Sequence, residues 1–113
     1  MLSISEKDTG SVYVCCLEGR LDGQTSPEAT ERLNTAMGTA GTKPMVLDLS
    51  HLEYLSSAGL RVILVAAKTA KAGGSQLALS SPTTSVKEVL DISGFAAVLP
   101  IHATLEEASQ DLS

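Results

Sequence analysis

Aromatic residues are nearly missing from this 113-residue chain, which has two Tyr, one Phe and no Trp. Side chains that could stack on nucleobases or sugar rings are therefore in short supply. Basic residues are also few: eight Lys and Arg stand against thirteen Asp and Glu, and the formal net charge is −5. A phosphate backbone would be repelled on average, so the composition argues against a nucleic-acid partner and favours a basic protein surface.

Long apolar runs are absent as well. The longest uninterrupted run, residues 62–67, is bounded by Arg61 and Lys68. It falls far short of the roughly 20 residues that a membrane span requires. The first ten residues contain no basic segment followed by an apolar one, so no signal peptide is expected. We therefore expect a cytoplasmic protein that does not insert into a membrane.

Cysteine is scarce, and the two that occur, Cys15 and Cys16, are adjacent. In a strand their side chains point to opposite faces, so no disulfide is expected between them. The cysteines have no metal-ligand spacing, and His51 and His102 form no recognisable metal cluster with the scattered acids. We expect two buried thiols in a reducing compartment, no bound metal and no cofactor.

The residues that are present indicate one compact α/β domain over residues 1–113. Hydrophobic residues make up 43%, which suits a globular chain with one core. Strands are expected at residues 2–4, 12–17, 45–49, 76–80 and 98–101. The first two form an antiparallel hairpin, and helices alternate with the later strands. This order predicts a small mixed, mostly parallel sheet with right-handed crossovers.

Capping signals mark the helix starts. Three Thr or Ser residues precede a Glu by three positions, the spacing of a capping box. These pairs are Thr25 with Glu28, Ser85 with Glu88, and Thr104 with Glu107, and Ser26 before Pro27 is an alternative start for the first helix. The helix after residue 59 is apolar on most sides, which predicts that it is largely enclosed.

Residues 46–64 carry the most informative pattern: an apolar run, a polar elbow at residues 56–59, and a helical stretch. A strand that leads directly into a helix places a serine at the helix mouth, where backbone N–H groups are free and the dipole is positive. On local chemistry alone Ser57 is an N-cap, contributing about 1 kcal/mol. The same position also suits a phosphoserine of about −1.5 to −2 charges, held by helix N–H groups.

An enzyme would need groups that the elbow does not supply. Residues 57–59 resemble the second half of a G-x-S-x-G nucleophile elbow, but Leu55 stands where that motif has Gly. Only His51 and His102 could serve as a base, and no pattern fixes either near Ser57. There is no phosphate-binding glycine loop. We assign no catalytic residue and expect a binding protein.

Together these segments carry a family resemblance. VLDLS at residues 46–50 and LEYLSSAGL at residues 52–60 resemble the signature of STAS domains, and most closely that of bacterial anti-sigma factor antagonists. The resemblance extends through GRLD at residues 19–22, GG at residues 73–74 and ISGF at residues 92–95, and so covers nearly the whole chain. It implies a STAS-like single domain with helices packed mainly on one side of the sheet.

The resemblance also implies a function. Such a protein, when unphosphorylated, binds an anti-sigma factor and frees a sigma factor; the anti-sigma factor is often a serine kinase of the histidine-kinase-like ATPase type. The kinase phosphorylates a serine that matches Ser57, and a metal-dependent serine phosphatase reverses the reaction. Many members have Asp where this chain has Ser56, so Ser56 is a second candidate acceptor. Ser57 lies two residues before Gly59, and this spacing favours Ser57 as the acceptor.

Asp22, at the end of the second strand, matches an acidic position beside the acceptor. The expected partner-binding face comprises Asp22, Gly23, Ser56, Ser57, Ala58, Gly59 and Arg61. Two other functions stay open. One is a STAS accessory subunit of a membrane transport system, in which Ser57 only caps its helix; the other is a nucleotide-binding STAS sensor, with phosphate held at the helix mouth.

Overall fold

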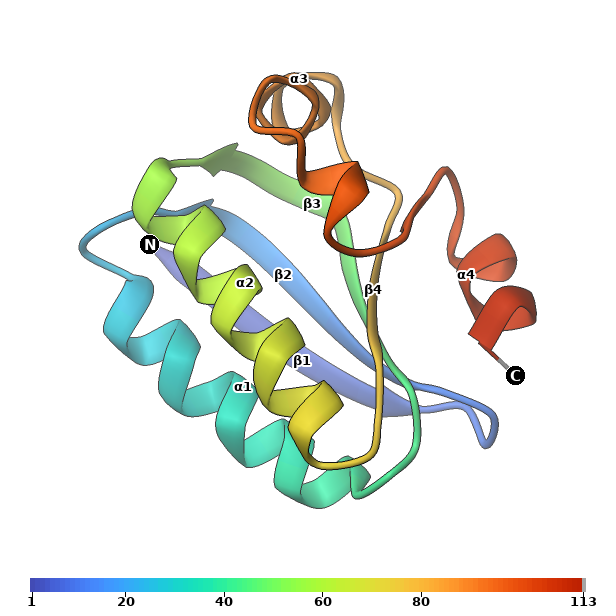
Figure 1. Ribbon diagram of the computed structural model, residues 1–113. Coiled ribbons are helices and arrows are strands. Elements are labelled where there is room, and N and C mark those ends of the chain that lie inside the picture. The colour runs from blue at the N-terminus through green and yellow to red at the C-terminus, as the bar shows by residue number, and fades with distance from the viewer. Residues whose placement is uncertain (113) are drawn as a thin grey trace.

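The computed structural model describes residues 1–112 as one five-stranded sheet with helices (Figure 1). The strands follow one another across the sheet as β1 (Leu2–Asp8), β2 (Tyr13–Leu21), β3 (Met45–Leu55), β4 (Leu77–Ser80) and β5 (Ile101–His102). The helices are α1 (Ser26–Ala40), α2 (Ser57–Ala72), α3 (Thr84–Ile92) and α4 (Leu105–Leu112), with a 3-10 turn η1 (Phe95–Ala97). Only the β1–β2 pair is antiparallel among these strands. The predicted α/β fold and its mostly parallel sheet are confirmed.

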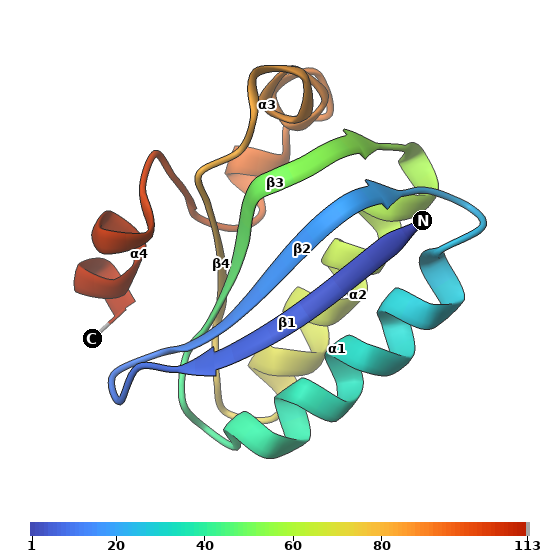
Figure 2. The ribbon, with the colours of Figure 1, turned by 180° about the vertical axis from the view of Figure 1, so that it is seen from behind.

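Helices α1 and α2 cover one face of the sheet, and α4 lies alone on the other, as the reverse view shows (Figure 2). The main core fills the space under α1 and α2, where Leu33 and Ile63 meet the inward side chains of the strands. A smaller cluster on the opposite face joins Val14 and Val46 to Leu112 of α4. The face that carries α1 and α2 is therefore the better-packed one, and the elbow belongs to it.

The two cysteines lie on opposite faces of β2, as the alternation predicts. Cys15 is fully buried in the main core. Cys16 is only half-buried, and its thiol donates a hydrogen bond to Asp48 on β3, with 3.3 Å between sulfur and oxygen. The expectation of two buried thiols is correct for Cys15 and wrong for Cys16, because the second face of the sheet is only partly covered.

Four strand predictions needed correction. β2, predicted to end at residue 17, continues to Leu21. β1 extends to Asp8 and β3 to Leu55, since pairing with β2 carries both strands beyond their apolar stretches. The strand predicted at residues 98–101 is wrong: η1 ends at Ala97, a turn and irregular backbone follow over residues 98–100, and the two-residue β5 begins only at Ile101. Pro100 lacks an N–H for the ladder, although its carbonyl still accepts from the N–H of Leu79 at 2.9 Å.

Capping at α3 and α4 gave opposite outcomes. The capping box predicted at Ser85 is wrong, because Thr83 stands at the cap position and makes no side-chain cap bond. The Thr83 hydroxyl donates instead to the carbonyl of Leu52 at 3.0 Å, so a tertiary contact replaces the local one. At α4 the hydroxyl of Thr104 accepts from the N–H of Glu107 at 3.1 Å, as predicted. Within residues 1–112, no helix combines the length and apolar character needed to cross a bilayer.

Candidate functional site

The elbow between β3 and α2 contains two serines with different surroundings. Ser56 occupies the N-cap position in an extended conformation, and its hydroxyl accepts from the backbone N–H of Gly59 at 3.2 Å. Ser57 is the first helical residue and is exposed, whereas Ser56 is half-buried. The prediction that Ser57 is the N-cap is therefore wrong, and Ser56 has that role. This leaves the Ser57 hydroxyl at the surface of the helix mouth.

The elbow is attached to the end of β2. The backbone N–H of Ser56 donates to the carbonyl of Leu21 at 3.0 Å. Gly59 packs so closely on that carbonyl that a Cβ atom there would lie 2.6 Å from its oxygen. Only glycine fits without a shift of the backbone. Gly59 is buried, so its part in the predicted face is to hold the elbow against β2.

The loop after β2 is held by its own polar groups. The Asp22 carboxylate accepts from the backbone N–H groups of Gln24 at 3.0 Å and of Thr25 at 3.1 Å. These bonds hold the pKa of Asp22 below its ordinary value, and the bond from the Thr25 N–H contributes more than the bond from the Gln24 N–H. In residues 1–112, the hydrogen bonds of this carboxylate stay within the loop, and Arg20 adds an ion pair at 3.7 Å. Gly23 lies exposed between these anchors.

Thr25 fixes the start of α1 in an unpredicted way. Its buried hydroxyl accepts from the N–H of Asp22 at 3.0 Å and donates to the carbonyl of Arg20 at 2.9 Å. It makes no cap bond to α1, and Ser26 is already inside the helix with its hydroxyl on the carbonyl of Asp22. Thr25 holds the predicted N-cap position, but neither predicted side-chain cap bond forms, because both hydroxyls turn back to close the loop.

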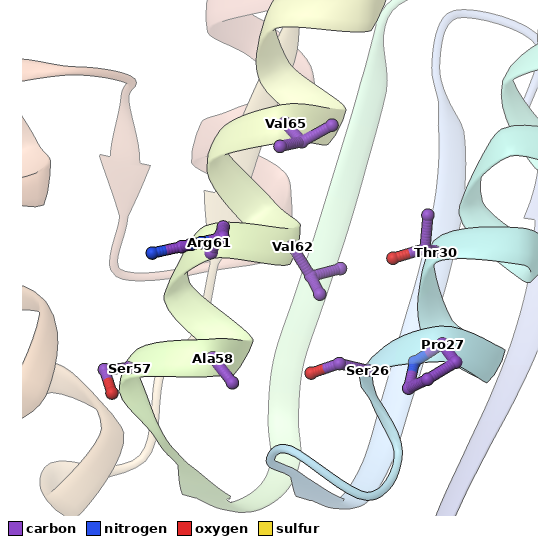
Figure 3. Close-up of a pocket in the computed structure, with 8 residues that line it drawn as sticks. All are labelled: Ser26, Pro27, Thr30, Ser57, Ala58, Arg61, Val62 and Val65. Atoms are coloured by element: carbon purple, nitrogen blue, oxygen red, sulfur yellow. The ribbon is translucent and has the colours of Figure 1, made fainter.

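A groove of about 560 Å³ runs between the first halves of α1 and α2 (Figure 3). Its lining comes from two helices: Ser26, Pro27 and Thr30 of α1, and Ser57, Ala58, Arg61, Val62 and Val65 of α2. The predicted residues Ser57, Ala58 and Arg61 meet here, but the contribution of α1 was not foreseen. The expectation of an enclosed helix is wrong at Val65, which is 46% exposed.

Comparison with known proteins gives the family. The STAS domain model matches residues 3–108. The chain belongs to the STAS domain family. BtrV of Bordetella bronchiseptica, classed as an anti-sigma factor antagonist, is 35% identical over 98 residues, which cover 87% of this chain and 84% of BtrV. The anti-sigma F factor antagonist of Paenibacillus polymyxa is 30% identical over 101 residues, with coverages of 89% and 86%.

The fold agrees with solved structures. The crystal structure of an anti-sigma factor antagonist from Mycobacterium paratuberculosis matches with a TM-score of 0.89 at 19% identity, covering 99% of this chain and 94% of the other. This likeness shows that the two chains share one fold over nearly their whole length.

Two features of α2 supply positive charge near the elbow of this STAS domain. The first turn of α2 contains no acidic residue, so the positive end of its dipole is not neutralised there. Arg61 is exposed one turn further on, and within residues 1–112 it takes part in no ion pair. Figure 3 shows Arg61 and Ser57 on the same side of α2, turned away from α1. The helix dipole and Arg61 would both favour a negative charge on Ser57 over one on a residue further along α2.

The histidines lie elsewhere. The ring of His51 shares a hydrogen bond with the Ser50 hydroxyl on β3, with 3.1 Å between Nδ1 and the oxygen. His102 Nε2 lies 3.4 Å from a carboxylate oxygen of Asp111 on α4. Neither ring lines the groove that contains Ser57. Among the described residues, no cluster of three His, Cys, Asp or Glu could hold a metal ion.

Proposed function

We propose that this STAS domain is an anti-sigma factor antagonist of the cytoplasm, and acts by binding rather than by catalysis. In its unphosphorylated form it binds an anti-sigma factor and so releases a sigma factor. The names of the two relatives support this assignment, because both match most of their length. The observation that carries the proposal is the exposed Ser57 hydroxyl, which stands at the helix mouth on the rim of a groove.

Ser57 is the proposed phosphoacceptor. A kinase needs a hydroxyl that it can reach, and Ser57 is exposed while Ser56 is half-buried and occupied by the N–H of Gly59. A phosphate on Ser56 would remove the cap of α2, whereas one on Ser57 would lie at the positive end of the dipole. The kinase would be the anti-sigma factor itself, of the histidine-kinase-like ATPase type. A metal-dependent serine phosphatase would restore the binding form.

The proposed docking face consists of the groove together with the loop at Asp22 and Gly23. Its floor is apolar at Val62 and Val65, and its rim carries Ser57 and Arg61. A phosphate dianion inside such an interface must be desolvated and adds negative charge. A loss of about 3 kcal/mol weakens binding more than a hundredfold, which is enough to release the partner.

The test combines phosphosite mapping with affinity measurement. The wild type, Ser57→Ala and Ser56→Ala are each incubated with a cognate anti-sigma kinase and ATP, and the product is mapped by mass spectrometry. We expect modification of Ser57 in the wild type and in Ser56→Ala, and none in Ser57→Ala. Calorimetry should then show that the phosphorylated wild type binds the kinase at least a hundredfold more weakly.

Other outcomes would replace parts of the proposal. Modification of neither serine would remove the switch, and tight binding by Ser57→Asp would remove its electrostatic basis. If no anti-sigma factor binds while millimolar ATP or GTP raises the melting temperature, the nucleotide-sensor alternative replaces the proposal. Co-purification with subunits of a transport system would favour the accessory-subunit alternative.

A further inference from the structure

We propose that Arg61 has two alternative ionic partners, one before and one after phosphorylation of the elbow. In the unphosphorylated domain its guanidinium is free to pair with a carboxylate of the partner. After phosphorylation it pairs with the phosphate on Ser57 in its own helix. This inference rests on the proposed function, because it takes Ser57 as the acceptor, and it adds a second residue that determines what the partner meets.

The geometry places the two side chains within reach. Ser57 and Arg61 are four residues apart on α2, and residues at this spacing are neighbours on one helix face. Both line the same groove, and both point to the side of α2 that faces away from α1 (Figure 3). An anion placed four residues before a cation is the favourable order along a helix. The planar guanidinium also matches two phosphate oxygens at once.

Arg61 differs from the other two arginines in having no competing acid. Arg20 stacks over the Tyr54 ring at 4.2 Å and pairs with Asp22. Arg32 pairs with Glu6 at 3.3 Å and donates to the carbonyl of Ile4 at 2.8 Å. Within residues 1–112, Arg61 has no such ion pair. In a chain of net charge −5, an unpaired cation beside the modified residue is available for a phosphate or for a partner.

The consequence is a change of sign at the rim of the groove. Before modification, Arg61 gives this rim one positive charge. Afterwards the phosphate brings about two negative charges at pH 7, and the sum with Arg61 is negative. A partner that presents an aliphatic side chain to Val62 and Val65, and a carboxylate to Arg61, would lose its counter-ion and meet a like charge.

The intramolecular contact can be measured without kinase or partner. Phosphoserine is encoded at position 57 of the full chain, and its second pKa is followed by phosphorus NMR in the wild type, Arg61→Gln and the control Lys68→Gln. Lys68 lies on the same helix, about 16 Å further along its axis, beyond the range of screened charges. We expect Arg61→Gln to raise this pKa by about 0.3 and Lys68→Gln to leave it unchanged.

Equal values in wild type and Arg61→Gln would overturn the intramolecular pair. Arg61 is exposed, so both variants should fold, and circular dichroism checks this. The partner contact has its own test: unphosphorylated Arg61→Gln should bind the anti-sigma factor about tenfold more weakly than Lys68→Gln. Equal affinities of the two variants would overturn the proposed contact between Arg61 and the partner. If no anti-sigma factor binds at all, the proposed function fails while the NMR result still decides on the pair.

Discussion

The side-chain oxygen of Ser56 lies 3.2 Å from the backbone nitrogen of Gly59 and closes the first turn of α2. This hydrogen bond gives the two adjacent serines different roles. Ser56 is committed to the fold, and Ser57, at the first helical position, keeps its hydroxyl at the surface. The elbow can therefore carry a modification next to its cap without losing the cap.

The two serines should differ in their effect on stability. Ser56→Ala removes the cap and should lower the free energy of unfolding by about 1 kcal/mol. The matched change Ser57→Ala touches an exposed hydroxyl and should stay within about 0.5 kcal/mol of wild type. Urea denaturation followed by circular dichroism gives both values. A larger loss for Ser57→Ala than for Ser56→Ala would contradict the assignment of the cap.

Replacing glycine by alanine should stabilise the domain in α1 and destabilise it in α2. A Cβ on Gly59 would lie 2.6 Å from the Leu21 oxygen, so Gly59→Ala should destabilise the domain by about 1–3 kcal/mol. Gly38 lies inside α1 with no atom within 4 Å of the added Cβ, and Gly38→Ala should stabilise by about 0.5–1 kcal/mol. Thermal unfolding of the two variants distinguishes them, and a stabilising Gly59→Ala would show that the elbow can move off β2.

The order of elements was predictable because hydrophobic periodicity and turn residues carry it locally. The prediction was poor wherever a side chain had a choice of partners. Thr25 and Thr83 occupy the N-cap positions of α1 and α3, yet their hydroxyls bond the carbonyls of Arg20 in β2 and Leu52 in β3. The Leu52 carbonyl is 31 residues from Thr83 in the sequence, and only the packed sheet brings the two together. Local spacing therefore identified the helices correctly and assigned several caps wrongly.

The candidate site was predictable in the same partial sense. The family signature marked Ser57 and its neighbours on one continuous segment. The other wall of the groove comes from Thr30 and the start of α1, some thirty residues earlier, and no local pattern marks a helix face that will oppose another helix. Exposure of Val65 was missed for the same reason, since an apolar residue carries no sign of whether its neighbour stops short of it.

The loop after β2 should depend on the Thr25 hydroxyl. Thr25→Val keeps the shape of the side chain but leaves the N–H of Asp22 and the carbonyl of Arg20 without this partner. Because Thr25 is only 8% exposed, we expect a loss of about 1–3 kcal/mol in denaturant unfolding. The control Thr30→Val changes an exposed residue and should be close to neutral. Equal stabilities would show that the loop closes without this hydroxyl.

The thiols should be inert at neutral pH and should limit stability in alkali. Burial raises the pKa of Cys15 to about 12, and burial together with the Asp48 bond raises the pKa of Cys16 to about 11. A folded thiol that holds its proton more tightly than an unfolded one stabilises the fold below its ordinary pKa of 9.0, and this contribution is lost as pH rises toward 11 and 12.

Two measurements check this sign. A disulfide reagent at pH 8 should leave both thiols unmodified in the native protein and titrate two per chain in guanidinium. The free energy of unfolding should then fall between pH 9 and pH 11. In Cys16→Ser this fall should be less steep, because position 16 no longer carries a thiol that titrates. Rapid native labelling at pH 8 would mean that the strand opens far more often than its packing implies.

The bond from the Ser56 N–H to the Leu21 carbonyl has a consequence for the entropy of recognition. It fastens the elbow to β2, whose next residues form the Asp22 loop, so both segments are ordered by folding itself. A partner that docks on them needs to immobilise little further chain, and more of its contact energy remains as affinity. A surface of this kind cannot yield to an intruding group by rearranging its backbone. Under the proposed switch, a phosphoryl group on Ser57 would therefore meet the partner on a backbone that cannot move aside.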